Sequence, residues 1–94
     1  MAPHFSVIIV NWNTRQMTAE CIASVYEMNR QTAFEIIVVD NASSDGSIPW
    51  LQQQFPQVRF ICNTTNTGFA RANNQAIEVA QGELLLLLNS DTIL

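Results

Sequence analysis

The sequence predicts an α/β fold in which helices cover both faces of a parallel sheet, and three observations favour it. Four short runs of apolar residues have the length and composition of strands that are buried on both faces. A segment with helical periodicity or helix-start chemistry follows each of the first three runs. The resulting β-α-β-α-β-α-β order is typical of a parallel sheet with right-handed crossovers, as a three-layer α/β/α arrangement.

The first two strands are the continuous apolar runs Phe5–Val10 and Phe34–Val39. Between them, Arg15–Met28 repeats apolar side chains at helical spacing, which predicts an amphipathic helix. Thr14 directly precedes this segment and can act as the N-cap of the helix.

The rest of the chain predicts two more helices and two more strands. Ser47 can cap a short helix, and Val58–Cys62 forms the third strand. The third helix begins after Gly68 and is expected to stop at Gly82. The fourth strand is the run "ELLLLL", which ends at Leu88.

A doubly wound sheet of this kind has the Rossmann-like strand order 3-2-1-4. It binds ligands beyond the carboxyl ends of the strands, at the point where the strand order reverses. Three polar segments meet there: "NWN" after the first strand, "DNASSD" after the second and "NSDT" after the fourth. The polar segments therefore coincide with the position that the topology favours for a site.

Composition restricts the classes of function. The chain has 94 residues, 48% hydrophobic and 13% charged, which indicates one small globular domain. A net charge of −4 argues against nucleic-acid binding through a basic patch. The absence of lysine excludes a P-loop and disfavours a phosphoacceptor receiver domain, and no G-x-G-x-x-G follows the first strand.

The cysteines and the N-terminus bear on the compartment. Cys21 and Cys62 lie far apart and match neither a disulfide framework nor a zinc site, so we expect buried free thiols in a reducing environment. The N-terminus lacks the features of a signal peptide, and the leucine run is too short to span a bilayer. A cytoplasmic location is therefore expected.

Two carboxylates, Asp40 and Asp91, each follow an apolar strand. Such a group needs a partner, which can be a ligand hydroxyl, a divalent cation or the backbone N–H groups of a loop. Two of them at one switch point favour a functional role over loop capping. Asp91, with Asn89 nearby, could hold Mg²⁺ if a phosphate completes the coordination shell.

Other side chains at this edge have two interpretations each. Trp12 could stack on a base or pack on the first helix or fourth strand, and Asn11 and Asn13 could contact a base edge or form the turn. Arg71 lies in the first turn of the third helix, where a bound phosphate or solvent exposure would explain it. Of Asn73 and Asn74, at least one could face the site.

Four motifs in order, "SVIIVNWNT", "EIIVVDNASSDGS", "NTGFARANNQAI" and "GELLLLLNSDT", resemble the N-terminal half of inverting family 2 glycosyltransferases with the GT-A fold. Within that family they look most like the rhamnosyltransferase-like branch. The resemblance covers nearly the whole chain. It implies a donor site for a nucleotide-diphosphate sugar, such as a UDP- or dTDP-sugar, with Mg²⁺ or Mn²⁺ as cofactor.

The resemblance also implies roles for single residues. Val10 and Trp12 match positions that contact the base, Asp40 and Asn41 match the pair that reads base and ribose, and Asp91 matches the metal-binding acid of a D-x-D motif. Asn41 and Asn89 stand where the family often has acids. The residues expected to bind the nucleotide sugar are Val10, Trp12, Asn13, Asp40, Asn41, Gly68, Arg71, Asn73 and Asn89, with Asp91 as the metal ligand.

Members of the family are much longer, so the resemblance implies that residues 1–94 are a single partial domain, the donor half, with the acceptor half and its catalytic base beyond Leu94. The chain alone is then expected to be inactive. The full-length protein would act on a saccharide or lipid-linked acceptor, at the inner face of the membrane. The alternative is a non-catalytic α/β interaction module that kept the fold without the ligand.

The leucine run has one further consequence. If the chain ends after it, Leu84–Leu88 becomes an exposed edge strand beside bare apolar surface. We expect such a chain to form a homo-oligomer through this strand.

Overall fold

The structure is a computed structural model that describes residues 3–28 and 32–91. The elements, in order, are β1 (Phe5–Asn11), α1 (Arg15–Met28), β2 (Phe34–Asn41), α2 (Ser47–Gln54), β3 (Arg59–Asn63), α3 (Phe69–Val79) and β4 (Leu84–Leu88). The predicted alternation of strands and helices is confirmed. β2 runs two residues further than expected, so Asp40 and Asn41 belong to the sheet itself.

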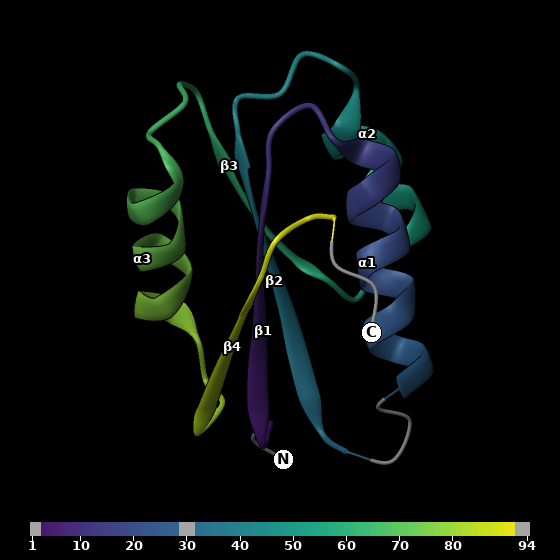
Figure 1. Cartoon of the computed structure of the whole chain (residues 1–94), viewed down its shortest axis with the longest axis vertical. Helices are drawn as coiled ribbons and strands as arrows, with labels where there is room; N and C mark the ends of the chain where they lie inside the picture. Colours follow the sequence, from purple (N-terminus) through teal and green to yellow (C-terminus); the bar gives the residue numbers. More distant parts are fainter. Residues whose placement is uncertain (1–2, 29–31, 92–94) are drawn as a thin grey trace.

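The four strands form one parallel sheet in the order β3-β2-β1-β4, which confirms the predicted order (Figure 1). β1 is central: Asn11 is level with Asp40 of β2, and Ile9 is level with Leu88 of β4. The strand order reverses between β1 and β4, so the switch point lies where these two strands end.

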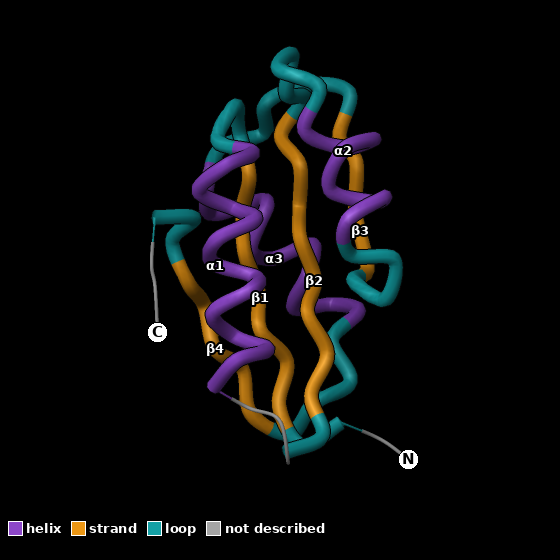
Figure 2. Tube along the Cα trace, turned by 90° about the vertical axis from the view of Figure 1, so that its right-hand side faces the viewer, coloured by secondary structure: helices purple, strands orange, loops and turns teal. Residues whose placement is uncertain are grey.

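The sheet lies between α1 and α2 on one face and α3 on the other, as the three-layer prediction requires (Figure 2), and each face carries its own apolar core. On one face α1 and α2 cover one alternating set of strand residues, including Val7, Ile9 and Val38. On the other face α3 covers Ile8, Ile37 and Val39 with the methyl groups of Ala72 and Ala76. Because side chains alternate along a strand, each face buries every second residue.

Two predicted helix ends are wrong. α3 ends at Val79, and Ala80 is already extended with φ −65° and ψ 137°, so Gly82 is not the helix stop. Gly82 instead lies against β1, where a Cβ atom would come within 2.4 Å of the Phe5 carbonyl carbon. Ser47 is the first residue of α2 and not its cap, since Gly46 occupies the N-cap position. Asp45 Oδ1 accepts hydrogen bonds from the Ser47 N–H (3.0 Å) and hydroxyl.

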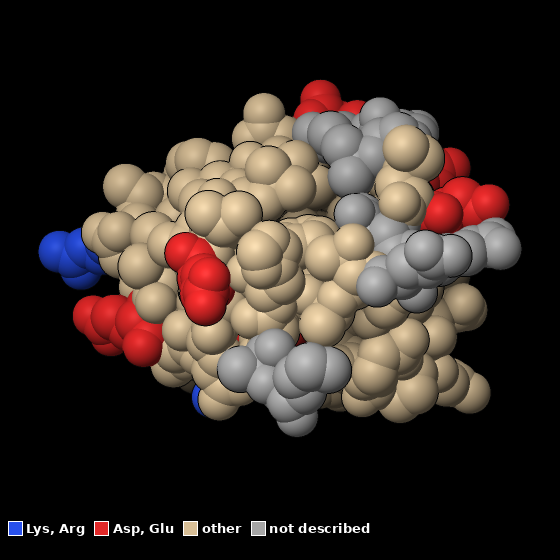
Figure 3. All heavy atoms as spheres, turned by 90° about the horizontal axis from the view of Figure 1, so that it is seen from below, with Lys and Arg blue, Asp and Glu red and all other residues tan. Residues whose placement is uncertain are grey.

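The turn between α3 and β4 is held at the amino ends of the strands. The Ser6 hydroxyl donates to Glu35 (2.6 Å) and accepts from the Gly82 N–H (2.8 Å). The Gln81 N–H donates to the same Glu35 oxygen at 2.6 Å. This network fixes where β4 begins. Figure 3 views the molecule from this end, where acidic side chains are scattered and basic ones show only at the rim.

β4 is covered less than the other strands. Its residues Leu84–Leu87 are 39–59% exposed, whereas Leu88 is buried at 9%. In the described part of the chain β4 pairs only with β1. No helix among residues 3–28 and 32–91 has the length and apolar character needed to cross a membrane.

Candidate functional site

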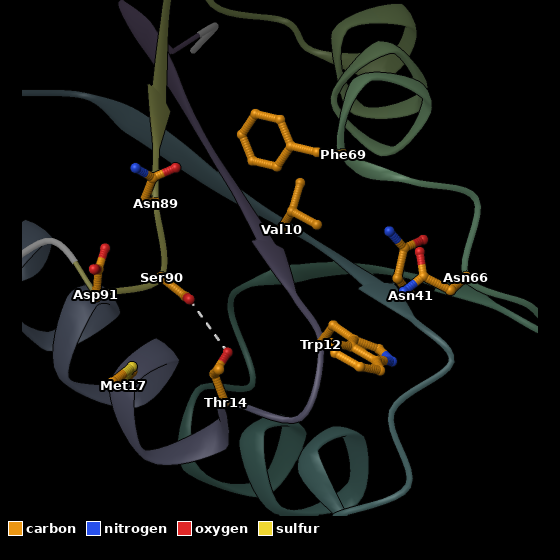
Figure 4. A pocket seen from close by; sticks show the side chains of 10 residues that line it. All are labelled: Val10, Trp12, Thr14, Met17, Asn41, Asn66, Phe69, Asn89, Ser90 and Asp91. Carbon is orange, nitrogen blue, oxygen red and sulfur yellow. Dashed lines mark hydrogen bonds between the residues drawn. The ribbon is translucent and has the colours of Figure 1, made fainter.

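A pocket of about 460 Å³ opens at the carboxyl ends of β1 and β4, where the topology predicts a site (Figure 4). One side of it is formed by Asn41 and Asn66, and the other by the segment that follows β4. The residues that line it are Val10, Trp12, Thr14, Met17, Asn41, Asn66, Phe69, Asn89, Ser90 and Asp91. Thr92, the last residue of the "NSDT" segment, lies outside the described residues.

The structure brings some of the predicted site residues together in this pocket: Val10, Trp12, Asn41, Asn89 and Asp91. The Trp12 ring is 53% exposed and therefore does not pack into the core. A large aromatic surface that is left open beside polar groups is suited to stacking on a planar ligand. The stacking interpretation of Trp12 is thus the one that the geometry favours.

Asp40 takes a different position from Asn41. Its carboxylate is buried, at 3% exposure, and is not part of the pocket lining. One oxygen accepts from Asn11 Nδ2 (2.7 Å) and from the Ser43 hydroxyl (2.6 Å), and the other accepts from the Ser43 N–H (3.0 Å). In this structure Asp40 holds together the loops that follow β1 and β2.

Asn13 joins the same two loops. It has a positive φ of 54°, a conformation that asparagine tolerates better than most residues. Its Oδ1 accepts from the Ser44 N–H (2.7 Å), and its own N–H donates to the Ser43 hydroxyl (2.9 Å). The turn-forming interpretation of Asn13 matches these contacts, and its predicted contact with the nucleotide stays a prediction.

Gly68, Arg71 and Asn73 are not among the residues that line the pocket, although Gly68 directly precedes the lining residue Phe69. Gly68 has φ 86° and ψ 166° and uses its carbonyl to accept from Asn41 Nδ2 at 3.2 Å. Asn73 is buried and donates to the Phe69 carbonyl at 3.1 Å, within its own helix. Arg71 is exposed. Their predicted roles in binding the donor remain predictions.

Sequence reasoning missed several lining residues: Thr14, Met17, Asn66, Phe69 and Ser90. Thr14 was expected only as a helix cap, but its hydroxyl donates to Asn11 Oδ1 (3.0 Å) and lies 3.2 Å from the Ser90 hydroxyl. This contact ties the segment after β4 to the end of β1. Asn66 and Phe69 lie within two residues of Gly68, which the family resemblance had already assigned to the site, so this glycine is the signal that could have pointed to them.

Oxygen atoms at one end of the pocket suit a hard cation. Asn89, Ser90 and Asp91 line that end, and their side chains carry an amide, a hydroxyl and a carboxylate oxygen. Mg²⁺ and Mn²⁺ accept such ligands, and Mg²⁺ commonly uses one or two carboxylates together with substrate phosphates. In the described part of the chain no three His, Cys, Asp or Glu side chains gather into a metal site.

The Asp91 carboxylate affects the pKa of a neighbouring thiol, Cys21. Burial, reinforced by the Asp91 carboxylate, raises the pKa of Cys21 to about 11. The thiol lies 3.8 Å from the Asn89 carbonyl, to which it donates. Burial therefore holds Cys21 in its thiol form at neutral pH. The expectation of buried thiols is correct for Cys21 and wrong for Cys62, which is exposed.

Comparison with known proteins gives the site its context. The chain is 34% identical over 91 residues to the uncharacterized glycosyltransferase YfnE of Bacillus subtilis, covering 94% of this chain and 23% of YfnE. It is 34% identical over 92 residues to the putative teichuronic acid biosynthesis glycosyltransferase TuaG of the same species, covering 95% of this chain and 36% of TuaG. The chain thus spans about a quarter to a third of the length of these relatives.

Solved structures share the fold. The mannosyltransferase PcManGT from Pyrobaculum calidifontis, in complex with GDP-Man and Mn²⁺, matches with a TM-score of 0.80 and 26% identity, over 99% of this chain and 29% of that one. TarS of S. aureus, residues 1–349 in complex with UDP, matches with a TM-score of 0.78 and 26% identity, over 93% of this chain and 27% of that one.

The sheet order and its alternating helices match those of GT-A glycosyltransferases. Residues 6–94, nearly the whole chain, match the sequence profile of "Glycosyl transferase family 2". The chain therefore belongs to glycosyl transferase family 2.

Proposed function

We propose that the chain binds a nucleotide-diphosphate sugar as the donor half of an inverting glycosyltransferase. The observation that carries the proposal is the arrangement of the pocket, with the exposed Trp12 ring and Asn41 on one side and the Asp91 carboxylate on the other (Figure 4). A base can stack on the ring while a diphosphate reaches the carboxylate end. A UDP- or dTDP-sugar fits this arrangement.

The comparisons support a nucleotide-sugar donor. TarS was solved with UDP, and PcManGT was solved with GDP-Man and Mn²⁺. TuaG is named for teichuronic acid biosynthesis, which favours a cell-wall or other polysaccharide as the product of the whole protein. The rhamnosyltransferase-like branch, a saccharide or lipid-linked acceptor and a cytoplasmic location at the inner face of the membrane are further parts of this proposal.

The chain's own residues would share the work of binding. The Trp12 ring would orient the base, and the Asn89, Ser90 and Asp91 oxygens would hold Mg²⁺ or Mn²⁺ against the phosphates. When bound, the cation neutralises the negative charge that builds on the nucleoside diphosphate leaving group. Thr14, beside Ser90, would keep that segment in place next to β1.

The acceptor hydroxyl must lose a proton during transfer, and this requires a base. Among the described residues that line the pocket, Asp91 is the only carboxylate, and the proposal assigns it to the cation. We therefore propose that the base comes from residues outside these 94, so that the chain binds the donor but does not transfer the sugar. Release of UDP in the presence of an acceptor, catalysed by this chain alone, would contradict that assignment.

The Asp91→Ala variant tests the donor site. Calorimetric titration with UDP and dTDP should show tighter binding in the presence of Mn²⁺, because a cation held by the carboxylate would also attract the phosphates. In Asp91→Ala, the nucleotide affinity in the presence of Mn²⁺ should fall about tenfold or more, which is the usual effect of removing a charge-assisted contact.

Glu20→Ala is the matched control, since Glu20 is an exposed acid on α1 that does not line the pocket. Its nucleotide affinity should equal that of the wild type. If no nucleotide binds with or without metal, the alternative function, a non-catalytic interaction module, is favoured instead.

A further inference from the structure

Two amide side chains, Asn41 and Asn66, line the same side of the pocket, remote from Asp91 (Figure 4). We propose that this amide corner (Asn41 and Asn66) selects a base with a carbonyl at C4 of a pyrimidine, or at C6 of a purine, over a base with an amino group at that position. The inference rests on the proposed function, because it takes the occupant to be a nucleoside diphosphate. It adds the property by which the base is chosen.

Hydrogen bonds fix the orientation of the Asn41 amide. Its Oδ1 accepts from the Thr67 N–H (3.4 Å) and hydroxyl (3.0 Å), and its Nδ2 donates to the Gly68 carbonyl at 3.2 Å. A backbone N–H can only donate and a backbone carbonyl can only accept. Rotating the amide by half a turn would place Asn41 Oδ1 against the Gly68 carbonyl and Nδ2 against the Thr67 N–H. One orientation is therefore strongly preferred.

A second pair of amides supports that orientation. Asn63 Nδ2 donates to Asn41 Oδ1 at 3.0 Å. Asn63 is itself held by Gln75 of α3 through two reciprocal bonds, Asn63 Nδ2 to Gln75 Oε1 (2.8 Å) and Gln75 Nε2 to Asn63 Oδ1 (2.9 Å). Asn63 and Gln75 do not line the pocket, and they act as positioning residues for Asn41.

The group that Asn41 offers to a ligand is therefore an N–H. The residue is only 2% exposed, and its oxygen is turned toward Asn63 and Thr67. Among residues 3–28 and 32–91, Nδ2 donates only to Gly68, which leaves one of its two hydrogens for the pocket. A donor that is buried at the wall of a pocket strongly favours a partner that accepts.

Asn66 presents the same polarity. Its Oδ1 accepts from the Gly68 N–H at 2.9 Å, so its Nδ2 is the end of the amide that can face a ligand. Both amides of the corner thus present N–H donors to the pocket. The Gly68 backbone orients both of them, since its carbonyl accepts from Asn41 and its N–H donates to Asn66. The exposed Trp12 ring lies beside them, which suits a stacked base.

Bases differ in the polarity of their exocyclic groups. Uracil and thymine carry an accepting oxygen at the position where cytosine carries a donating amino group, and guanine and adenine differ in the same way. An amino group set against the amide corner would place donors against donors. Uracil and cytosine have almost the same shape, so this pair isolates hydrogen-bond polarity from size.

The test is calorimetric titration of the chain with UDP, CDP, GDP and ADP at constant Mn²⁺. We expect UDP to bind about tenfold or more tightly than CDP, and GDP more tightly than ADP, because the mismatched bases leave buried donors unpaired. Equal binding of UDP and CDP by the wild type would overturn the inference and leave the proposed function standing. No binding of any nucleotide would overturn both.

Variants show whether Asn41 carries the preference. Asn41→Asp replaces the donor by an acceptor, so the ratio of UDP to CDP affinity should fall to about one or reverse. Gln75→Ala should lower the same ratio, since it frees Asn63 without touching the ligand. Asn74→Asp, at an exposed residue of α3 outside the pocket, is the control and should leave the ratio unchanged. An unchanged ratio in a folded Asn41→Asp protein would contradict the role of Asn41, and the wild-type ratio decides the proposal if that variant does not fold.

Discussion

Gly68 has a backbone conformation that residues with a Cβ atom rarely adopt, with φ 86° and ψ 166°. The space around it is open, since a Cβ atom built there would meet nothing within 4 Å. The requirement for glycine at this position therefore comes from backbone strain and not from crowding. It matters for the pocket because both amides of the corner bond to the Gly68 backbone.

Gly68→Ala should lower the free energy of unfolding by about 1–3 kcal/mol, the usual cost of such a conformation for an L-residue. Urea unfolding followed by circular dichroism measures it. Gly46→Ala is the comparison: Gly46 has φ 77° and ψ 18°, a left-handed conformation that costs alanine less. A Gly68→Ala protein as stable as the wild type would mean that the loop relaxes freely.

Side-chain direction explains which residues of β1 and β2 reach the pocket. Val10 follows Ile8 on the face of α3, and Asn41 follows Val39 on the same face. Asp40 is one residue out of phase and turns to the other face, where it meets Asn11. The alternation was readable in the sequence. The approach of Asn66 and Phe69 was not, because it depends on the path of a loop that only the folded chain defines.

At the scale of elements, the four apolar runs predicted the strands to within one or two residues, because continuous burial leaves few alternatives. Helix ends were harder. The expected stop at Gly82 fails because this glycine serves a tertiary contact with β1, which local pattern does not reveal. The expected cap Ser47 fails because the helix begins at Ser47 itself, whose N–H donates to Asp45 two residues earlier.

The start of α2 should be sensitive to acid. Burial raises the pKa of Asp45, but hydrogen bonds from Ser47 and from the Arg15 N–H outweigh it and hold the pKa below the ordinary value of 3.8. The stabilisation is therefore complete above that ordinary value and is lost as the pH falls through the lower folded pKa. The difference in unfolding free energy between wild type and Asp45→Asn should shrink as the pH drops from about 5 to about 2.5. A difference that does not change with pH would show that Asp45 adds no charge-dependent stability.

At the scale of the whole molecule, β4 is the least protected strand. Four successive leucines are 39–59% exposed on it, and in the described part of the chain its outer edge pairs with no other strand. Exposed apolar edges of this kind recruit further strands. The relatives are longer than this chain, so a further stretch of polypeptide is one possible cover and a second copy is another.

We predict that the 94-residue chain self-associates through Leu84–Leu88. Light scattering coupled to gel filtration should give a mass that rises with concentration. Leu85→Lys should lower the measured mass, because a lysine on an edge strand opposes pairing with a further strand. Gln53→Lys, on the exposed side of α2, adds the same charge and should have no effect. A strictly monomeric wild type at high concentration would refute the prediction.

The pairing of β1 with β4 also sets the order in which the molecule can mature. Phe5 is level with Leu84 and Ile9 with Leu88, so the two strands come from opposite ends of the chain. β1, β2 and β3 can assemble from neighbouring segments, whereas β4 must close a loop of almost the full length, which is costly in entropy and slow. Because Asn89, Ser90 and Asp91 directly follow β4, we expect the pocket to be completed only when β4 joins the sheet. A ligand that spans the pocket would bind only the fully folded chain and would favour it by mass action, which makes nucleotide affinity a direct reporter of completed folding.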